Sequence, residues 1–101
     1  MWVRVPPSAL FLVLTGTVVY FVYVIISCSH DFIYVGITDD LDRRIKQHNS
    51  GFCKSTRQYR PFKFLLTESF PTRDAARKRE KYLKSSAGRE FLNTLKRVRN
   101  L

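Results

Sequence analysis

Apolar runs separated by short polar segments dominate the first half of the chain. Two of them, Tyr20–Ser27 and 32–37, are rich in Val, Ile, Tyr and Phe, the residues favoured in buried strands. The polar stretch between them, 28–31, is short enough for a hairpin, so we expect an antiparallel pair. A third run, Phe62–Phe70, begins with alternating polarity and predicts another strand.

Helical patterns fill the remaining segments. The first helix should start after Thr38, which can cap it, and end at the Asn-Ser-Gly of 49–51. A second helix is expected over 72–85 and a third over 89–97, with a break at Ser-Ser-Ala-Gly. The order β-β-α-β-α-α predicts an α+β fold, a small and largely antiparallel three-stranded sheet flanked by helices.

The apolar N-terminus allows more than one interpretation. Residues 5–29 carry no charge, and 9–26 is just long enough for a membrane span of about 18 residues. If 20–27 is a strand, too little remains to cross a bilayer, so we expect a cytoplasmic protein. The alternative, an anchor over 5–26, stays open. Val-Arg-Val-Pro at 3–6 is encoded by GTTCGAGTCCC, which looks like a tRNA T-arm, so the start codon could also be assigned too far upstream. We divide the chain into an extension (1–19), a domain (20–97) and a tail (98–101).

The charge balance points to a polyanionic partner. The sequence has 18 Lys and Arg against 8 Asp and Glu, a formal net charge of +10. Such an excess is typical of proteins that bind nucleic acid or an anionic membrane surface. The apolar fraction of 45% excludes a disordered tail. Zinc is not expected, because no common site has the spacing of Cys28, His30, His48 and Cys53.

Three residues attract attention as candidates for phosphate chemistry. Arg44 and His48 lie one helical turn apart, where a guanidinium can clamp phosphate oxygens and an imidazole can move a proton. Glu80 falls on the apolar stripe of a strongly basic helix. Its carboxylate could pair with Lys84 or act as a hard ligand for Mg²⁺.

In series with two strand tyrosines, these residues resemble a known family. "FVY" ends at Tyr23, "YVG" runs from Tyr34 to Gly36, and "LDRRIKQHNSG" contains the Arg and His. Together with the pattern over 61–92, they resemble the GIY-YIG endonuclease superfamily, in particular small stand-alone bacterial members similar to the N-terminal nuclease domain of bacterial excinuclease. The first triplet departs from the pattern, with Phe21 and Val22 in place of Gly and Ile.

The resemblance implies a nuclease that hydrolyses DNA phosphodiester bonds with one divalent metal, Mg²⁺ or Mn²⁺, in DNA repair or recombination. It implies Glu80 as metal ligand, Arg44 as phosphate stabiliser, and Tyr23, Tyr34 or His48 as the group that orients or deprotonates water. We favour Tyr23 as the base. Gly36 would let backbone approach the phosphate, and Asn93 would support the site. Candidate backbone contacts are Lys54, Thr56, Arg57, Arg60, Arg73, Arg77 and Lys81.

The substrate and the competing functions remain open from sequence. We see no element that reads bases, so we expect structure-selective cleavage or direction by a targeting protein, from a monomer or weak dimer. One alternative is a catalytically dormant basic module that binds nucleic acid. Another is a small membrane-anchored protein, based on the uncharged N-terminal stretch.

Overall fold

The computed structural model describes residues 19–99. The order of elements in this part is the expected one, and the α+β fold class is confirmed. The strands and helices are β1 (Tyr20–Ser27), β2 (Ile33–Thr38), α2 (Leu41–Ser50), the short 3-10 helix η1 (Arg57–Tyr59), β3 (Phe62–Phe70), α3 (Arg73–Lys84) and α4 (Ser86–Val98).

The sheet is antiparallel throughout, in the order β2-β1-β3. The middle strand β1 is covered on both faces, which explains why its sequence is apolar without alternation. Its register pairs Tyr23 with Gly36 of β2 and with Thr67 of β3. In this register the two sequence triplets meet at one pair, in which Tyr23, the last residue of the first triplet, lies opposite Gly36, the last residue of the second.

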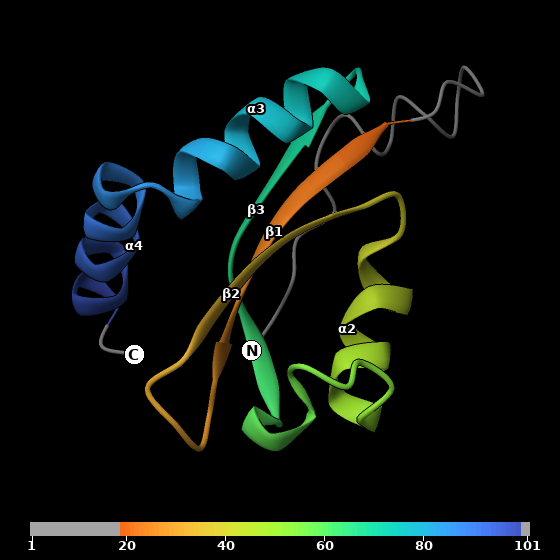
Figure 1. The fold of residues 1–101 in the computed structure, drawn as a ribbon, viewed down its shortest axis with the longest axis vertical. Coiled ribbons are helices and arrows are strands. Elements are labelled where there is room, and N and C mark those ends of the chain that lie inside the picture. Colours follow the sequence, from red (N-terminus) through yellow and green to blue (C-terminus); the bar gives the residue numbers. More distant parts are fainter. Residues whose placement is uncertain (1–18, 100–101) are drawn as a thin grey trace.

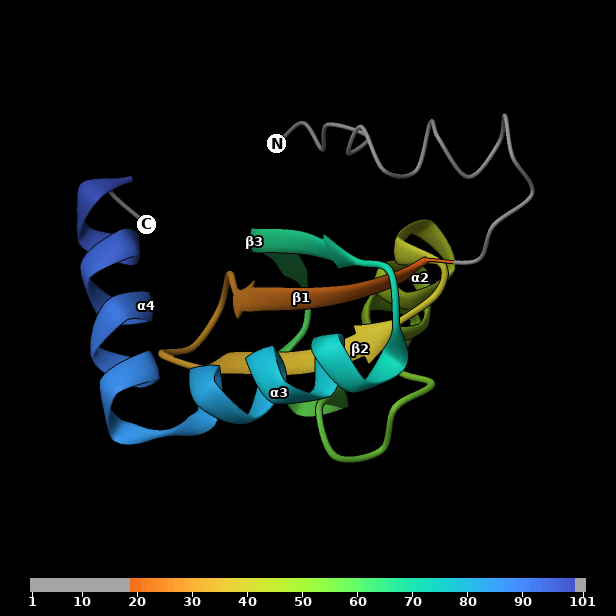
Figure 2. The same ribbon diagram turned by 90° about the horizontal axis from the view of Figure 1, so that it is seen from above.

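Helices cover both faces of the sheet, as Figures 1 and 2 show. One face of β1, with Val22 and Val24, packs into a core with Ala76 and Leu83 of α3 and Leu92 of α4. The other face, which carries Phe21, Tyr23 and Ile25, packs into a second core with Leu41 of α2 and Phe62 and Phe64 of β3. The side chains of β1 alternate between the two cores, so the same strand anchors all three helices.

Two helix starts differ from the sequence prediction. Asp40, not Thr38, is the N-cap of α2, because its side chain accepts from the backbone N–H of Arg43. The hydroxyl oxygen of Thr38 instead accepts a hydrogen bond from the backbone N–H of Asp40, in the turn that precedes the helix. Helix α4 begins at Ser86, capped by Ser85, so Gly88 lies inside the first turn rather than in a break.

The N-terminal interpretations fall on residues 1–18, outside the part that the structure describes. Within residues 19–99, the structure has no helix long and apolar enough to cross a membrane.

Candidate active site

Tyr23 is the centre of a buried polar cluster on the α2 face of the sheet. Its side chain is 1% exposed and extends across the strand toward Gly36. A Cβ atom on Gly36 would lie 2.6 Å from the Tyr23 hydroxyl oxygen, closer than any real contact. The absence of a side chain at Gly36 therefore leaves space for the Tyr23 hydroxyl. This explanation for a glycine at position 36 differs from the one expected from sequence, a close approach of the backbone to a phosphate.

Helix α2 supplies the partners of this hydroxyl. Arg44 donates from Nε to the Tyr23 oxygen at 3.0 Å, and Nε2 of His48 lies 2.9 Å from the same oxygen. The predicted face of the helix is confirmed, with Leu41 and His48 buried and Ile45 partly buried. One turn of helix thus brings a guanidinium and an imidazole to a single phenolic oxygen.

His48 is held from its other side by the loop that follows α2. Its Nδ1 lies 3.0 Å from the hydroxyl oxygen of Thr56, a residue 1% exposed. Gly51 ends α2 in the left-handed conformation, with φ 85°, and turns the chain so that this loop returns over the helix end. The hydroxyl of Thr56 is therefore used inside the protein, which makes it a poor phosphate contact.

Burial shifts the pKa of both titratable groups in the cluster. Burial raises the pKa of Tyr23 to about 12, against the opposing hydrogen bond and charge of Arg44. Burial, and then the positive charge of Arg44, lower the pKa of His48 to about 4. At neutral pH the cluster holds a neutral phenol, a neutral imidazole and one permanent cation.

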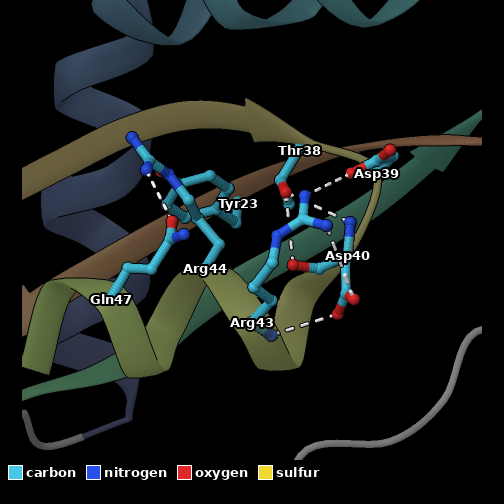
Figure 3. Close-up of polar contacts among 7 residues, drawn as sticks. All are labelled: Tyr23, Thr38, Asp39, Asp40, Arg43, Arg44 and Gln47. Atoms are coloured by element: carbon cyan, nitrogen blue, oxygen red, sulfur yellow. Dashed lines mark hydrogen bonds and ion pairs between the residues drawn. The ribbon is translucent and has the colours of Figure 1, made fainter.

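A polar hollow opens beside this cluster at the end of β2. Its volume is about 550 Å³, and it is lined by Tyr20, Ile37, Thr38, Asp39, Arg43, Arg44, Gln47 and Arg73. Gln47 accepts from Arg44 at 2.9 Å and so directs the guanidinium (Figure 3). Arg43 is instead neutralised by Asp39 at 2.7 Å, with Asp40 at 3.9 Å. Of these two neighbouring arginines, Arg44 is the one without a carboxylate partner among residues 19–99.

Tyr34 completes the aromatic side of the site. Its ring centroid lies 6.2 Å from that of Tyr23 and 5.0 Å from that of His48. It is more exposed than Tyr23 and comes from the edge strand β2. The two tyrosines and the histidine therefore lie together, as the sequence pattern predicts.

Glu80 is not in contact with these residues. It lies on α3, which packs on the opposite face of the sheet, and its carboxylate accepts from Lys84 at 3.0 Å. Arg79, its neighbour, turns toward β3 and pairs with Glu68 at 2.8 Å. Because successive residues of a helix differ by about 100° around its axis, Glu80 lies on a different side of α3 from Arg79. Asn93 is exposed on α4.

The remaining candidates lie in two places. Three of them, Lys54, Arg57 and Arg60, are exposed on the loop after α2. The other three, Arg73, Arg77 and Lys81, are exposed on α3. Arg73 lies over the Tyr20 ring at 5.8 Å and, unlike Arg77 and Lys81, lines the same hollow as Arg44.

A divalent metal would find one carboxylate here rather than a preformed cage. Across residues 19–99 no group of three or more His, Cys, Asp or Glu side chains gathers in a way that could hold a metal ion. The side chain of Glu80 is 20% exposed, and its ion-pair partner, Lys84, is exposed as well. This fits Mg²⁺, which is often held by one or two carboxylates together with water and substrate phosphates.

Comparison with known proteins shows the family of this chain. The family model described as the GIY-YIG catalytic domain matches residues 19–95. The chain belongs to the GIY-YIG family. This is a nuclease family whose members act on DNA, generally with a divalent metal.

Relatives of this GIY-YIG protein include small chains of similar extent. A UPF0213 protein of Haloquadratum walsbyi is 42% identical over 67 residues, which cover 65% of this chain and 74% of the relative. A UPF0213 protein of Halalkalibacterium halodurans is 36% identical over 89 residues, covering 76% and 94%. The solution NMR structure of a UPF0213 protein from Bacillus halodurans is 38% identical, with a TM-score of 0.47 and coverage of 77% and 85%.

Two residues contribute to the site in ways that the sequence does not predict. Gln47 accepts from Arg44, and its i,i+3 spacing from that arginine is the signal that could identify it. Thr56, expected at the DNA backbone, instead contacts His48. This contact depends on the path of the loop, which local sequence patterns do not specify.

Proposed function

We propose that this protein is a metal-dependent endonuclease that hydrolyses DNA phosphodiester bonds. The observation that carries the proposal is the cluster of Tyr23, Arg44 and His48, in which one phenolic oxygen meets a guanidinium and a buried imidazole beside a polar hollow. A polar cluster of this kind costs desolvation free energy unless its members are fully hydrogen-bonded, so a purely structural helix would be served better by apolar side chains. Family membership supports the same conclusion.

Arg44 is the phosphate-binding group in this proposal. It lines the hollow and has neutral oxygens, those of Tyr23 and Gln47, as its partners. A phosphate that enters the hollow would therefore meet a guanidinium that need not break an ion pair first. A bidentate pair between Arg44 and two phosphate oxygens would stabilise the charge that develops during hydrolysis.

Tyr23 and His48 provide the path for the proton. Tyrosinate is scarce at neutral pH when the pKa of Tyr23 is about 12, so Tyr23 needs an acceptor for its own proton. Nε2 of His48 lies at 2.9 Å and supplies one. As the phenolic oxygen takes the proton of the attacking water, its hydroxyl proton passes to His48. Tyr34, beside both rings, would orient that water.

Glu80 would hold the divalent ion, with phosphate oxygens and water as the other ligands. When bound, Mg²⁺ or Mn²⁺ supplies charge neutralisation at the scissile phosphate and the leaving oxygen. The partial exposure of the Glu80 side chain and its pairing with an exposed lysine rather than a buried partner support this role. Asn93 would support this site, and Arg73, Arg77 and Lys81 would contact the DNA around it.

The test is nicking of supercoiled and branched DNA with Mg²⁺ or Mn²⁺, comparing the wild type with Glu80→Ala. We expect Glu80→Ala to lower cleavage about 100-fold or more while DNA binding is kept. Lys84→Ala is the matched control, because it breaks the same ion pair and leaves the carboxylate in place. Absence of cleavage on all substrates, or equal cleavage by wild type and Glu80→Ala, would reject the nuclease.

A second candidate function is a catalytically dormant module that binds DNA. The exposed cations on the loop after α2 favour it, as does the net charge of +10. Salt-sensitive binding without cleavage, in any metal, would select it. For the nuclease we expect preference for branched or otherwise distorted DNA, or delivery by a targeting protein, in repair or recombination. A panel of branched, nicked and linear duplexes tests that preference directly.

A further inference from the structure

Two contacts define where the hydroxyl proton of Tyr23 lies. Arg44 Nε, which can only donate, occupies one side of the phenolic oxygen at 3.0 Å. His48 Nε2, at 2.9 Å, is the other partner of this oxygen in the described part of the chain. With Tyr23 1% exposed, its own hydrogen must point to His48 or remain unpaired. Nε2 of His48 is therefore the unprotonated nitrogen.

The contact of the other ring nitrogen of His48, Nδ1, leads to the same placement of the imidazole hydrogen. The Thr56 hydroxyl can donate to the carbonyl oxygen of Cys53 at 3.4 Å, which leaves its lone pairs free to accept from His48. The distance from His48 Nδ1 to this oxygen is 3.0 Å, and both residues are buried. A neutral imidazole carries one N–H, and this arrangement places it on Nδ1.

We propose that Thr56 is a positioning residue that keeps the hydrogen of His48 on Nδ1, so that Nε2 faces Tyr23 as a proton acceptor. The proton path runs from Tyr23 Oη to His48 Nε2, and the Nδ1–H bond to Thr56 stabilises the imidazolium that forms. Its consequence for cleavage rests on the proposed nuclease function. Its structural half, the tautomer, does not.

Losing the Thr56 hydroxyl would reverse the tautomer preference of His48. Thr56→Val keeps the volume and the branched Cβ but offers no acceptor, so an N–H on Nδ1 would be buried without a partner. The alternative tautomer places the hydrogen on Nε2, where it donates to Tyr23 and can no longer accept. Thr56→Ser keeps the hydroxyl and loses only a methyl group, which makes it the matched variant.

The experiment is nitrogen-15 NMR of the imidazoles in the full-length chain near pH 7, without DNA or metal. His30→Gln assigns the His48 signals, since His30 is the other histidine of the chain. We expect hydrogen on Nδ1 in wild type and Thr56→Ser, and on Nε2 in Thr56→Val. Hydrogen on Nε2 in the wild type, or an unchanged tautomer in Thr56→Val, would overturn the proposal. The wild-type spectrum decides the first point even if Thr56→Val fails to fold.

Cleavage provides the second readout. Thr56→Val should lower the cleavage rate about 10- to 100-fold, a loss of the size found when the partner that orients a metal-bound histidine is removed. Thr56→Ser should restore it to within about threefold. If the tautomer follows the prediction and the wild type cleaves nothing, the proposed function fails and the role of Thr56 in orienting His48 stands. If the tautomer changes and cleavage does not, the role of Thr56 in the reaction is rejected.

Discussion

Gly36 shows how a single missing side chain can create a site. The sequence motif marks this glycine, but the reason becomes visible only in the β1–β2 register, which places it opposite Tyr23. An alanine Cβ would lie 2.6 Å from the hydroxyl oxygen and 2.7 Å from Cζ of the Tyr23 ring. The ring is buried and cannot move aside without repacking the core around it.

We expect Gly36→Ala to lower the free energy of unfolding by about 1–3 kcal/mol and to lower cleavage as well. Urea unfolding measures the first effect. In a Tyr23→Val background the ring is gone, so the same substitution should cost less than half as much. An unchanged unfolding free energy together with lost cleavage would instead support the expectation from sequence that Gly36 lets backbone approach a phosphate.

His48 makes stability depend on pH in a defined window. Its pKa is lowered from 6.5 to about 4 in the folded protein, so between these values the unfolded chain binds a proton that the folded chain does not. The contribution of His48 to the free energy of unfolding is therefore fully present above about pH 6.5, and it is lost as the pH decreases toward 4. From the shift, we expect a loss of about 2–3 kcal/mol between pH 7 and 4.5.

Urea unfolding at a series of pH values tests this expectation. His48→Gln should remove most of the decrease between pH 7 and 4.5, although the variant is less stable at neutral pH. His30→Gln, made at the exposed histidine of the hairpin connection, should keep it. An equal decrease in wild type and His48→Gln would show that His48 is not the group responsible.

At the scale of elements, the sequence predicts strands and helices well because hydrophobic periodicity is local. The bounds of β1 and β3 are those expected, and α3 lies within the predicted 72–85. Gly88 is the instructive exception. Glycine usually indicates a helix end, but here it lies inside α4, where a Cβ would meet the carbonyl oxygen of Tyr82 at 2.1 Å. The glycine serves the packing of α4 on α3, a tertiary contact without a local signal.

Gly88→Ala should therefore destabilise the protein even though alanine favours helices. The added Cβ would also lie 2.5 Å from Cα of Leu83, and neither backbone can yield without separating the two helices. We expect a loss of about 3 kcal/mol or more in urea unfolding. Ser86→Ala, in the same turn but exposed, should change stability by less than about 0.5 kcal/mol. A neutral Gly88→Ala would show that the helices have room to separate.

At the scale of the whole molecule, the candidate residues come from both faces of one sheet. Tyr23, Arg44 and His48 lie on the α2 face, and Glu80 lies on α3 across the sheet. Sequence order and the family resemblance predict that they act together, but no local pattern states how they meet. Strand β2 is an edge strand of the sheet and packs against α3. We propose that a DNA backbone passing along this edge would allow Arg44 and Glu80 to contact the same phosphate.

We propose that the exposed loop after α2 guides DNA to that edge. Lys54 and Arg57 project from it, while Thr56 between them fixes the loop to His48. Each cation that neutralises a phosphate contributes about 0.9 to the slope of log K against log salt concentration. We expect Lys54→Ala with Arg57→Ala to reduce this slope by about 2, measured by fluorescence anisotropy over a salt range of roughly 50 to 300 mM.

The control removes the same charge from another surface. Lys78 and Arg89 are exposed on α3 and α4, and replacing both with alanine leaves the net charge equal to that of the loop variant. If DNA follows the β2 edge, this control keeps the wild-type slope. A slope that falls equally in both variants would mean that binding depends on the total charge of the protein, and the loop would then have no directing role.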